Sequence, residues 1–247
     1  MIRLLHLHLD LPNPLQNNFH VSSTLKAVKR TKAKEVCYKM TLSCENLRAM
    51  KSHLNLDLAQ DAQLWSLILT CFYGLLRISN VTVPNPDSWD PVKIIARQDI
   101  TISPEGCVMG IRWAKNLQLR DRILHVALPR LNNDLCPTFA LLNMLRLAGP
   151  VPPAAPAWSL CPPQGPLTAP TPAWVRLRLQ RLIAAIGLPP SEYNTHSLRR
   201  SGASHLLSSG VPCEVIKVLG DWKRDAVFRY LKPQPQQRLH MANQAFS

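Results

Sequence analysis

The sequence lacks the cysteine patterns that build zinc sites and disulfide frameworks. Its seven cysteines are scattered along the chain, and none of them forms a C-x-x-C pair. This distribution disfavours a structural zinc site or a set of disulfide bridges, and it is typical of proteins in a reducing compartment. No cluster of metal-ligating residues stands out either, so we expect neither a metal nor another cofactor.

Long apolar runs are also missing. No uninterrupted apolar stretch approaches the roughly 18 residues that a membrane-spanning helix requires. The beginning of the chain, MIRLLHLHLDLP, is mildly apolar, but two histidines and an aspartate interrupt it and no small-residue cleavage site follows. A secretory signal is therefore not expected. We expect a soluble, intracellular protein with no membrane partner.

Acidic residues are scarce. The chain has 15 Asp and Glu against 29 Lys and Arg, which gives a formal net charge of +14. Such an excess favours a polyanionic partner, most simply nucleic acid. A basic protein without any particular partner would show the same balance, so charge alone leaves both interpretations open. With 247 residues, 46% of them apolar, the chain can bury a core and is not expected to be disordered.

Hydrophobic periodicity predicts a mainly α-helical protein with a small antiparallel β-sheet, an α+β fold. Between residues 92 and 128 the apolar period is two, and strands are predicted at residues 99–103, 107–113 and 122–129. The remaining pattern is helical, and its predicted helix starts carry a capping residue or an early proline. These starts are Ser43, Leu58 (with Asp57 and Gln60 as a capping box), Pro137, Thr171 with Pro172, Thr195 and Pro212.

Two regions give weaker signals. Residues 1–40 show little periodicity, and their basic stretch at residues 25–34 could be a short helix or a solvated tail. Nine prolines lie between residues 150 and 172. Because proline removes a backbone donor and blocks helix interiors, we expect this stretch to be a loop or an insertion on the surface.

The segment with the most informative chemistry is THSLRRSGASHLLSSGVPCEVIKVLGDWKRDAVFRYL, residues 195–231. His196 and Arg199 are three residues apart, so on a helix their side chains share a face and could converge on one anion. Arginine suits bidentate phosphate binding, and histidine suits proton transfer near neutral pH. Tyr230 could join them as a covalent nucleophile if the chain folds back. The combination indicates a phosphodiester substrate.

This segment resembles the C-terminal signature of tyrosine recombinases, the phage-integrase-like family. The HSLR motif at residues 196–199 looks like the H-x-L-R box of the family, and Tyr230 falls where the nucleophile belongs. Upstream, GLLRISN looks like the first arginine box and contains Arg77. WAKNLQLRDRILHVALP is similar to the lysine-bearing β-turn with its following strand, and it contains Lys115. The match spans roughly residues 40–235.

The order of these motifs carries more weight than any one of them. Taken singly, Tyr230 would more often be a core aromatic residue and Lys115 a solvated charge in a turn. Coincidence would have to place all of the boxes in the order of the family. The amino-acid sequences of the motifs LLRISN and GDWKRDAVFRYL are most similar to those of recombinases from DIRS/Ngaro-type and Crypton mobile elements.

The resemblance implies a site-specific DNA recombinase or integrase that cleaves and rejoins strands through a 3′-phosphotyrosyl intermediate, without metal or ATP. Arg77 and Arg199 would then clamp the scissile phosphate. Lys115 would protonate the leaving 5′-oxygen, and His196 would assist proton transfer from the nucleophile. Tyr230 would attack phosphorus.

A further position of the family site, a His or Trp that packs on the phosphate, is less clear in this sequence. Counting forward from His196 leads to Trp222, whereas counting back from Tyr230 leads to Asp221. We predict Trp222, because an indole N–H can donate to phosphate and a carboxylate would repel it.

The resemblance also implies a domain organisation and partners. Residues 1–40 would be a remnant of an N-terminal core-binding (SAM-like) domain or a linker, residues 41–235 the catalytic domain, and residues 236–247 a C-terminal tail. We expect double-stranded DNA as the partner, assembly as a homotetramer on DNA, and a nuclear location. Two alternatives share the motifs: a catalytically decayed or domesticated DNA-binding copy of a mobile element, and a relaxing enzyme similar to type IB topoisomerases.

Overall fold

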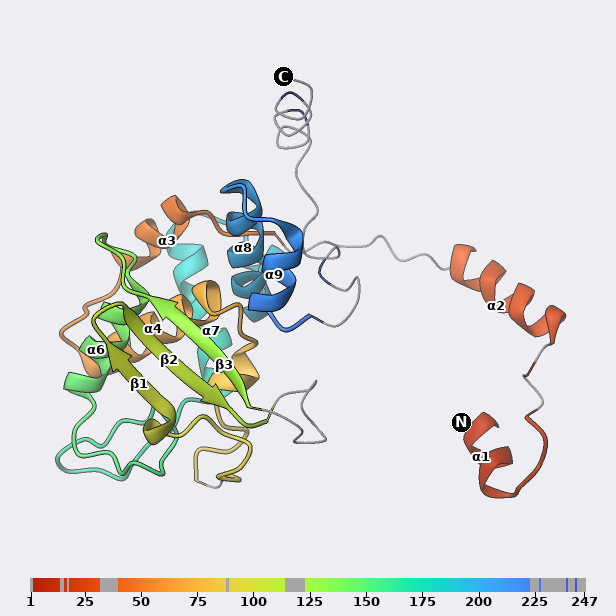
Figure 1. Ribbon diagram of the computed structural model, residues 1–247, viewed down its shortest axis with the longest axis horizontal. Coiled ribbons are helices and arrows are strands. Elements are labelled where there is room, and N and C mark those ends of the chain that lie inside the picture. The colour runs from red at the N-terminus through yellow and green to blue at the C-terminus, as the bar shows by residue number, and fades with distance from the viewer. Residues whose placement is uncertain are drawn as a thin grey trace. The chain divides into compact units, whose positions relative to one another are not determined.

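The computed structural model describes residues 2–13, 16, 18–31, 40–87, 89–113 and 123–222, together with residues 227, 239 and 243. The chain divides into two compact units, Met1–Tyr38 and Lys39–Ser247 (Figure 1). None of the helices in the described ranges is both long and apolar enough to cross a membrane. The six cysteines within these ranges are all free thiols.

The described part of the first unit contains the helices α1 (Ile2–His8) and α2 (Phe19–Thr31). The Asn18 side chain accepts a hydrogen bond from the backbone N–H of Val21 (3.1 Å), as an N-terminal cap does. Helix α2 includes most of the basic stretch at residues 25–34, for which the sequence allowed either a short helix or a solvated tail. Helix α1 was not predicted, since its leucines follow no helical stripe.

The second unit combines a three-stranded antiparallel sheet with helices that pack against one of its faces (Figure 1). Its helices include α3 (Cys44–Lys51), α4 (Ala59–Tyr73), α5 (Ile78–Val81), α6 (Pro137–Leu147), α7 (Pro172–Ala185), α8 (Thr195–Ser208) and α9 (Cys213–Leu219), with short 3-10 turns at Arg97–Asp99 and Pro190–Glu192. This architecture confirms the predicted mainly helical α+β class.

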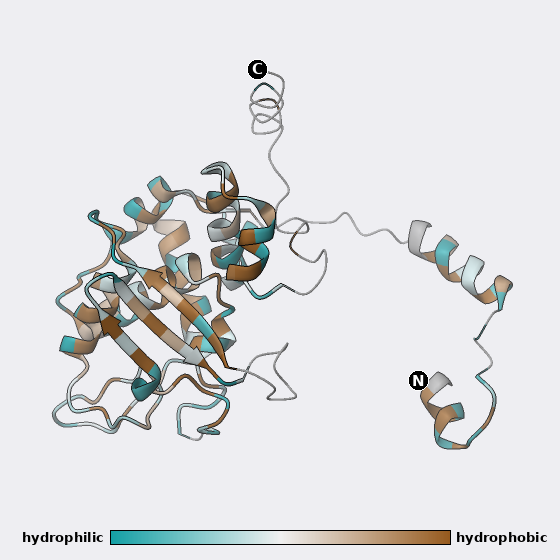
Figure 2. Cartoon of the chain, viewed as in Figure 1, coloured by the Kyte–Doolittle hydropathy of each residue, from teal (hydrophilic) through white to brown (hydrophobic). Residues whose placement is uncertain are grey.

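The strands are β1 (Ile100–Ser103), β2 (Gly106–Ile111) and β3 (Leu124–Pro129), in the order β1-β2-β3. Val108 lies opposite Ala127 in the β2–β3 register. Along β3, exposed and buried side chains alternate from His125 to Pro129, and hydrophobic residues make up most of the strand (Figure 2). One face of the sheet is therefore packed on the helices. The prediction placed all three strands and set some of their ends too wide.

Helix α4 is the centre of the core. Every residue from 62 to 72 is buried, as expected of a helix that is apolar on nearly all sides. It packs against α6 and α8. The predicted capping box before this helix is wrong: Leu58 stands at the N-cap without a side-chain hydrogen bond. Asp61, in the first turn of α4, accepts a hydrogen bond from the backbone N–H of Asn55 (2.9 Å) instead.

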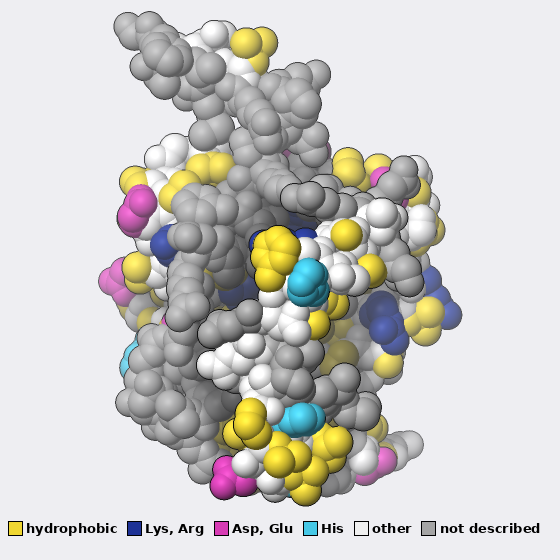
Figure 3. Space-filling view, turned by 90° about the vertical axis from the view of Figure 1, so that its right-hand side faces the viewer, with side chains coloured by type: hydrophobic (Ala, Val, Ile, Leu, Met, Phe, Trp, Pro, Cys, Tyr) yellow, Lys and Arg dark blue, Asp and Glu magenta, His cyan; other side chains and the backbone are white. Residues whose placement is uncertain are grey.

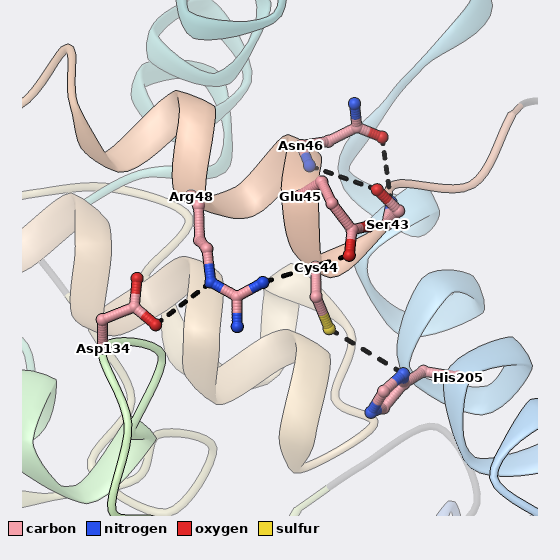
Figure 4. A network of polar contacts seen from close by, with 7 residues as sticks. All are labelled: Ser43, Cys44, Glu45, Asn46, Arg48, Asp134 and His205. Carbon is pink, nitrogen blue, oxygen red and sulfur yellow. Dashed lines mark hydrogen bonds and ion pairs between the residues drawn. The ribbon is translucent and has the colours of Figure 1, made fainter.

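The chain enters this unit along α8. The backbone N–H of Leu42 donates to Ser201 Oγ (2.7 Å), and Ser43 caps α3 as predicted. In the close view of Figure 4, Cys44 of α3 points toward His205 of α8, with 3.8 Å between Sγ and Nδ1. Arg48 reaches from α3 to Asp134 in the loop before α6, with Nε 3.2 Å from Oδ1. Helix α3 therefore links α8 to the α6 side of the unit.

The proline-rich stretch is a loop, as predicted, but only part of it lies on the surface. Residues 152–154 and 162–166 are exposed, whereas residues 155–160 are buried and Trp158 is 1% exposed. Its indole Nε1–H donates to Ser66 Oγ (3.1 Å), while its carbonyl accepts from Gln63 Nε2 (2.6 Å), and both partners lie on α4. Arg97 Nη2 donates to two further carbonyls of the stretch, each at 3.0 Å. Proline removes donors, but the carbonyls and Trp158 still build a packed layer.

Replacing Trp158 with alanine should lower the free energy of unfolding by about 4 kcal/mol, because it opens a large cavity beside α4. Urea denaturation measures this change. Leu177→Ala is the control, since Leu177 is 49% exposed and its loss should cost less than about 1 kcal/mol. Equal losses in the two variants would show that the stretch does not belong to the core.

Candidate active site

Helix α8 carries the two predicted residues His196 and Arg199 close to its N-terminus. The Asn194 side chain caps the helix by accepting from the backbone N–H of Ser197 (3.2 Å), and Ser197 Oγ accepts from the Asn194 N–H (3.2 Å). The predicted cap, Thr195, is wrong by one residue and is instead the first helical residue. Asparagine and threonine are both favoured at the N-cap, so the sequence alone does not distinguish Asn194 from Thr195 as the cap.

Arg199 is a buried cation, only 3% exposed. Its guanidinium donates through Nη1 to the carbonyl of Leu75 and through Nη2 to the carbonyl of Gly220 (2.6 Å). Its Cζ lies 4.2 Å from the centroid of the Trp222 ring, a cation–π distance. Burial of a charge is costly without such partners, so these contacts fix the position of the guanidinium.

The carbonyl of Leu75 belongs to the C-terminal end of α4. Leu75 adopts a left-handed conformation (φ 50°), and the N–H of Leu76 donates to the Cys71 carbonyl (3.2 Å). This is a Schellman ending with leucine at the position that glycine usually occupies. A left-handed leucine is disfavoured, and the bond to Arg199 helps to compensate that cost.

The carbonyl of Gly220 belongs to the end of α9, which is built in the same way. Asp221 is left-handed (φ 49°), and the N–H of Trp222 donates to the Lys217 carbonyl (3.0 Å). Helix C-termini carry partial negative charge. Two such ends meet at Arg199, and their charge favours a buried cation there.

Arg77 lies beside Arg199. It precedes α5 in an extended conformation, and its backbone N–H donates to Asn80 Oδ1 (3.1 Å). Arg77 and Arg199 line one small hollow, together with Asn80, Gly220 and Asp221. The structure thus brings together two predicted arginines that are far apart in the sequence.

His196 lies within the electrostatic reach of both arginines. Its side chain is exposed at the surface, yet its surroundings remove enough water to lower the pKa of the imidazole, and the positive charges of Arg77 and Arg199 lower this pKa further. The neutral imidazole is therefore favoured near neutral pH, and it can accept a proton.

Trp222 is 7% exposed and packs with Leu75, Ala203 and Ile216. Gly220 is required beneath its ring, since a Cβ at that position would lie 1.8 Å from Trp222 Cζ3. Asp221 lines the hollow instead. Trp222 thus stacks on the Arg199 guanidinium, whereas Asp221 is one of the residues around the hollow. The assignment of Trp222 rather than Asp221 to the site stays a prediction.

Two predicted residues, Lys115 and Tyr230, fall outside the described residues. Val227 is described, fully buried, and part of the cluster around Trp222. Sequence reasoning missed Asn80, although an asparagine three residues after Arg77 is a recognisable backbone-capping signal. Within the described ranges, no group of three or more His, Cys, Asp and Glu side chains could hold a metal ion.

Figure 3 shows Lys and Arg side chains both near the middle and toward the right-hand edge of this view, and a few Asp and Glu side chains around its outline.

No family model and no curated protein matches this sequence. Among solved structures, the chain is similar to the XerA recombinase, with a TM-score of 0.60 and 13% identity over 99% of this chain and 72% of that one. It is also similar to the XerH site-specific recombinase bound to palindromic difH substrate in a post-cleavage complex. That match has a TM-score of 0.58 and 17% identity over 84% of this chain and 53% of that chain.

This chain has the tyrosine recombinase fold. It spans about half of the XerH chain that it matches. At these identities the recombinase likeness establishes the architecture, and the chemistry of the site has to be argued from its residues.

The lowered pKa of His196 can be tested by NMR titration of its imidazole. We expect it to titrate below its ordinary value, and Arg77→Gln should raise its pKa because one neighbouring positive charge is removed. Since the unfolded chain binds this proton more readily, His196 favours the folded state above its unfolded pKa, and that contribution is lost as the pH falls. Arg176→Gln, an exposed site on α7, serves as the control. An unchanged pKa in Arg77→Gln would contradict the arrangement.

Proposed function

We propose that the protein is a site-specific DNA recombinase that cleaves and rejoins DNA strands through a 3′-phosphotyrosyl intermediate. The observation that carries this proposal is the hollow in which Arg77 meets Arg199, with His196 close enough for both charges to act on it. The net charge of +14 and the recombinase fold support DNA as the substrate.

In the proposed reaction, the two arginines hold the non-bridging oxygens of the scissile phosphate. Preorganised cations at that point stabilise the charge that develops in the transition state. Phosphate binding at Arg199 adds to, or replaces, its hydrogen bonds to the Leu75 and Gly220 carbonyls. The stacked Trp222 ring keeps the guanidinium plane oriented while this happens.

The tyrosine chemistry rests on residues placed by the motif. The phenol oxygen of Tyr230 attacks phosphorus and its proton passes to the neutral His196 imidazole, while the bond from phosphorus to the 5′-oxygen breaks and Lys115 protonates that oxygen. The bond energy is kept in the phosphotyrosyl link, so rejoining needs neither ATP nor a metal.

The remaining expectations belong to the same proposal. They are a catalytic domain at residues 41–235, a core-binding remnant or linker at 1–40, a tail at 236–247, a DNA-bound homotetramer, a nuclear location, and an origin in a mobile element of the DIRS/Ngaro or Crypton type.

One observation favours the decayed DNA-binding alternative: the acidic residue Asp221 is among those that line the hollow, and a negative charge there opposes an anion. The alternatives differ in whether a covalent bond to DNA forms.

A pool of nicked duplexes with randomised sequence tests the reaction, because a nick lets the 5′-hydroxyl fragment diffuse away and traps the intermediate. We expect the protein to form a covalent DNA adduct that survives denaturation, and Tyr230→Phe to form none. DNA binding without an adduct would support the decayed alternative. Relaxation of plasmids that contain none of the recovered sequences would support a topoisomerase-like activity.

DNA binding should also weaken steeply with salt, because phosphate contacts release counterions. The logarithm of the binding constant should fall linearly with the logarithm of salt concentration, and Arg77→Gln should reduce the slope by about 1. Fluorescence anisotropy with a labelled duplex measures both slopes. A slope near zero for the unmodified protein would contradict a nucleic-acid function.

A further inference from the structure

Asn80 is a polar residue of the hollow for which the proposed reaction has no role. It lies on α5, three residues after Arg77, and lines the same hollow as Arg77 and Arg199. Two hydrogen bonds join it to Arg77: the Arg77 N–H donates to Asn80 Oδ1 (3.1 Å), and the Asn80 N–H donates to the Arg77 carbonyl (2.9 Å).

The first of these bonds fixes the orientation of the Asn80 side-chain amide. The Arg77 N–H is a donor and can be met only by an acceptor, so the oxygen of the amide has to face it. The other end of the amide is the NH₂ group, which can only donate. Asn80 therefore holds the backbone of Arg77 with one end and offers N–H donors with the other.

We propose that Asn80 is a third phosphate contact of this site, which donates its amide N–H to a phosphate oxygen held by Arg77 and Arg199. The inference rests on the proposed function, since it assigns a further binding residue to the same phosphodiester. A carboxylate at position 80 would also accept the Arg77 N–H, but it would repel the ligand. Asparagine satisfies both requirements.

Residues of both charges surround the hollow, so variants can separate the effect of the Asn80 amide donor from the effect of net charge. Arg77 and Arg199 attract an anion, and a negative charge on Asp221 opposes it. Asn80→Asp keeps the acceptor for Arg77, removes the donor and adds one negative charge. Asp221→Asn removes one negative charge, and asparagine tolerates the left-handed conformation of that position. The double variant therefore has the original net charge without the Asn80 donor.

The test measures binding of inorganic phosphate to the full chain by the response of the His196 ring signals in NMR. We expect Asn80→Asp to weaken binding more than tenfold, and Asp221→Asn to strengthen it severalfold. The double variant should stay about tenfold weaker than the unmodified protein, because a hydrogen bond to a charged group is lost. Asn80→Ala, which loses the cap as well, should also bind more weakly, and circular dichroism shows whether each variant is folded.

Recovery of the original affinity in the double variant would overturn the inference, since charge alone would then explain Asn80→Asp. Arg77→Gln separates this failure from failure of the proposed function. If Arg77→Gln weakens phosphate binding and the double variant binds normally, only the role of Asn80 fails. If Arg77→Gln has no effect, or His196 shows no response to phosphate, the hollow is not a phosphate site and both proposals fail.

Discussion

The buried guanidinium of Arg199 is the constraint on which the site depends. A cation that is 3% exposed needs acceptors inside the protein, and the chain provides carbonyls from the ends of α4 and α9. Two helices that are remote in sequence must therefore end at the same point. The Trp222 ring closes the remaining side. The same residue that would bind phosphate also joins the elements that form the site.

Close packing of α8 on the end of α4 makes this junction possible. A Cβ at Gly202 would lie 1.9 Å from the Phe72 carbonyl oxygen, so only glycine allows the two helices to approach this closely. From that crossing, Arg199 reaches the carbonyl of Leu75 directly beyond the last turn of α4. On another side of α4, Trp158 and its proline-rich stretch hold the helix in place.

The sequence predicted local structure better than tertiary contacts. Ser43, Pro137 and Thr171 with Pro172 start or precede helices as predicted, because caps and prolines act through their own backbone. The burial of Trp158 was missed, since it depends on partners in α4 that no local pattern reveals. The motif brought Arg77 and Arg199 into consideration together. The carbonyls that hold Arg199 could not be foreseen, because a left-handed leucine goes against its intrinsic preference.

The hydrogen bonds of the segment around residue 40 tie the beginning of the second unit to α8. The Met40 N–H donates to the Glu192 carbonyl just before α8 (2.8 Å), and the Leu42 N–H donates to Ser201 Oγ on the helix itself (2.7 Å). Ser201 lies two residues beyond Arg199. These two bonds therefore anchor α8 both before its first turn and close to Arg199, and they help to hold the helix where its guanidinium reaches the Leu75 and Gly220 carbonyls.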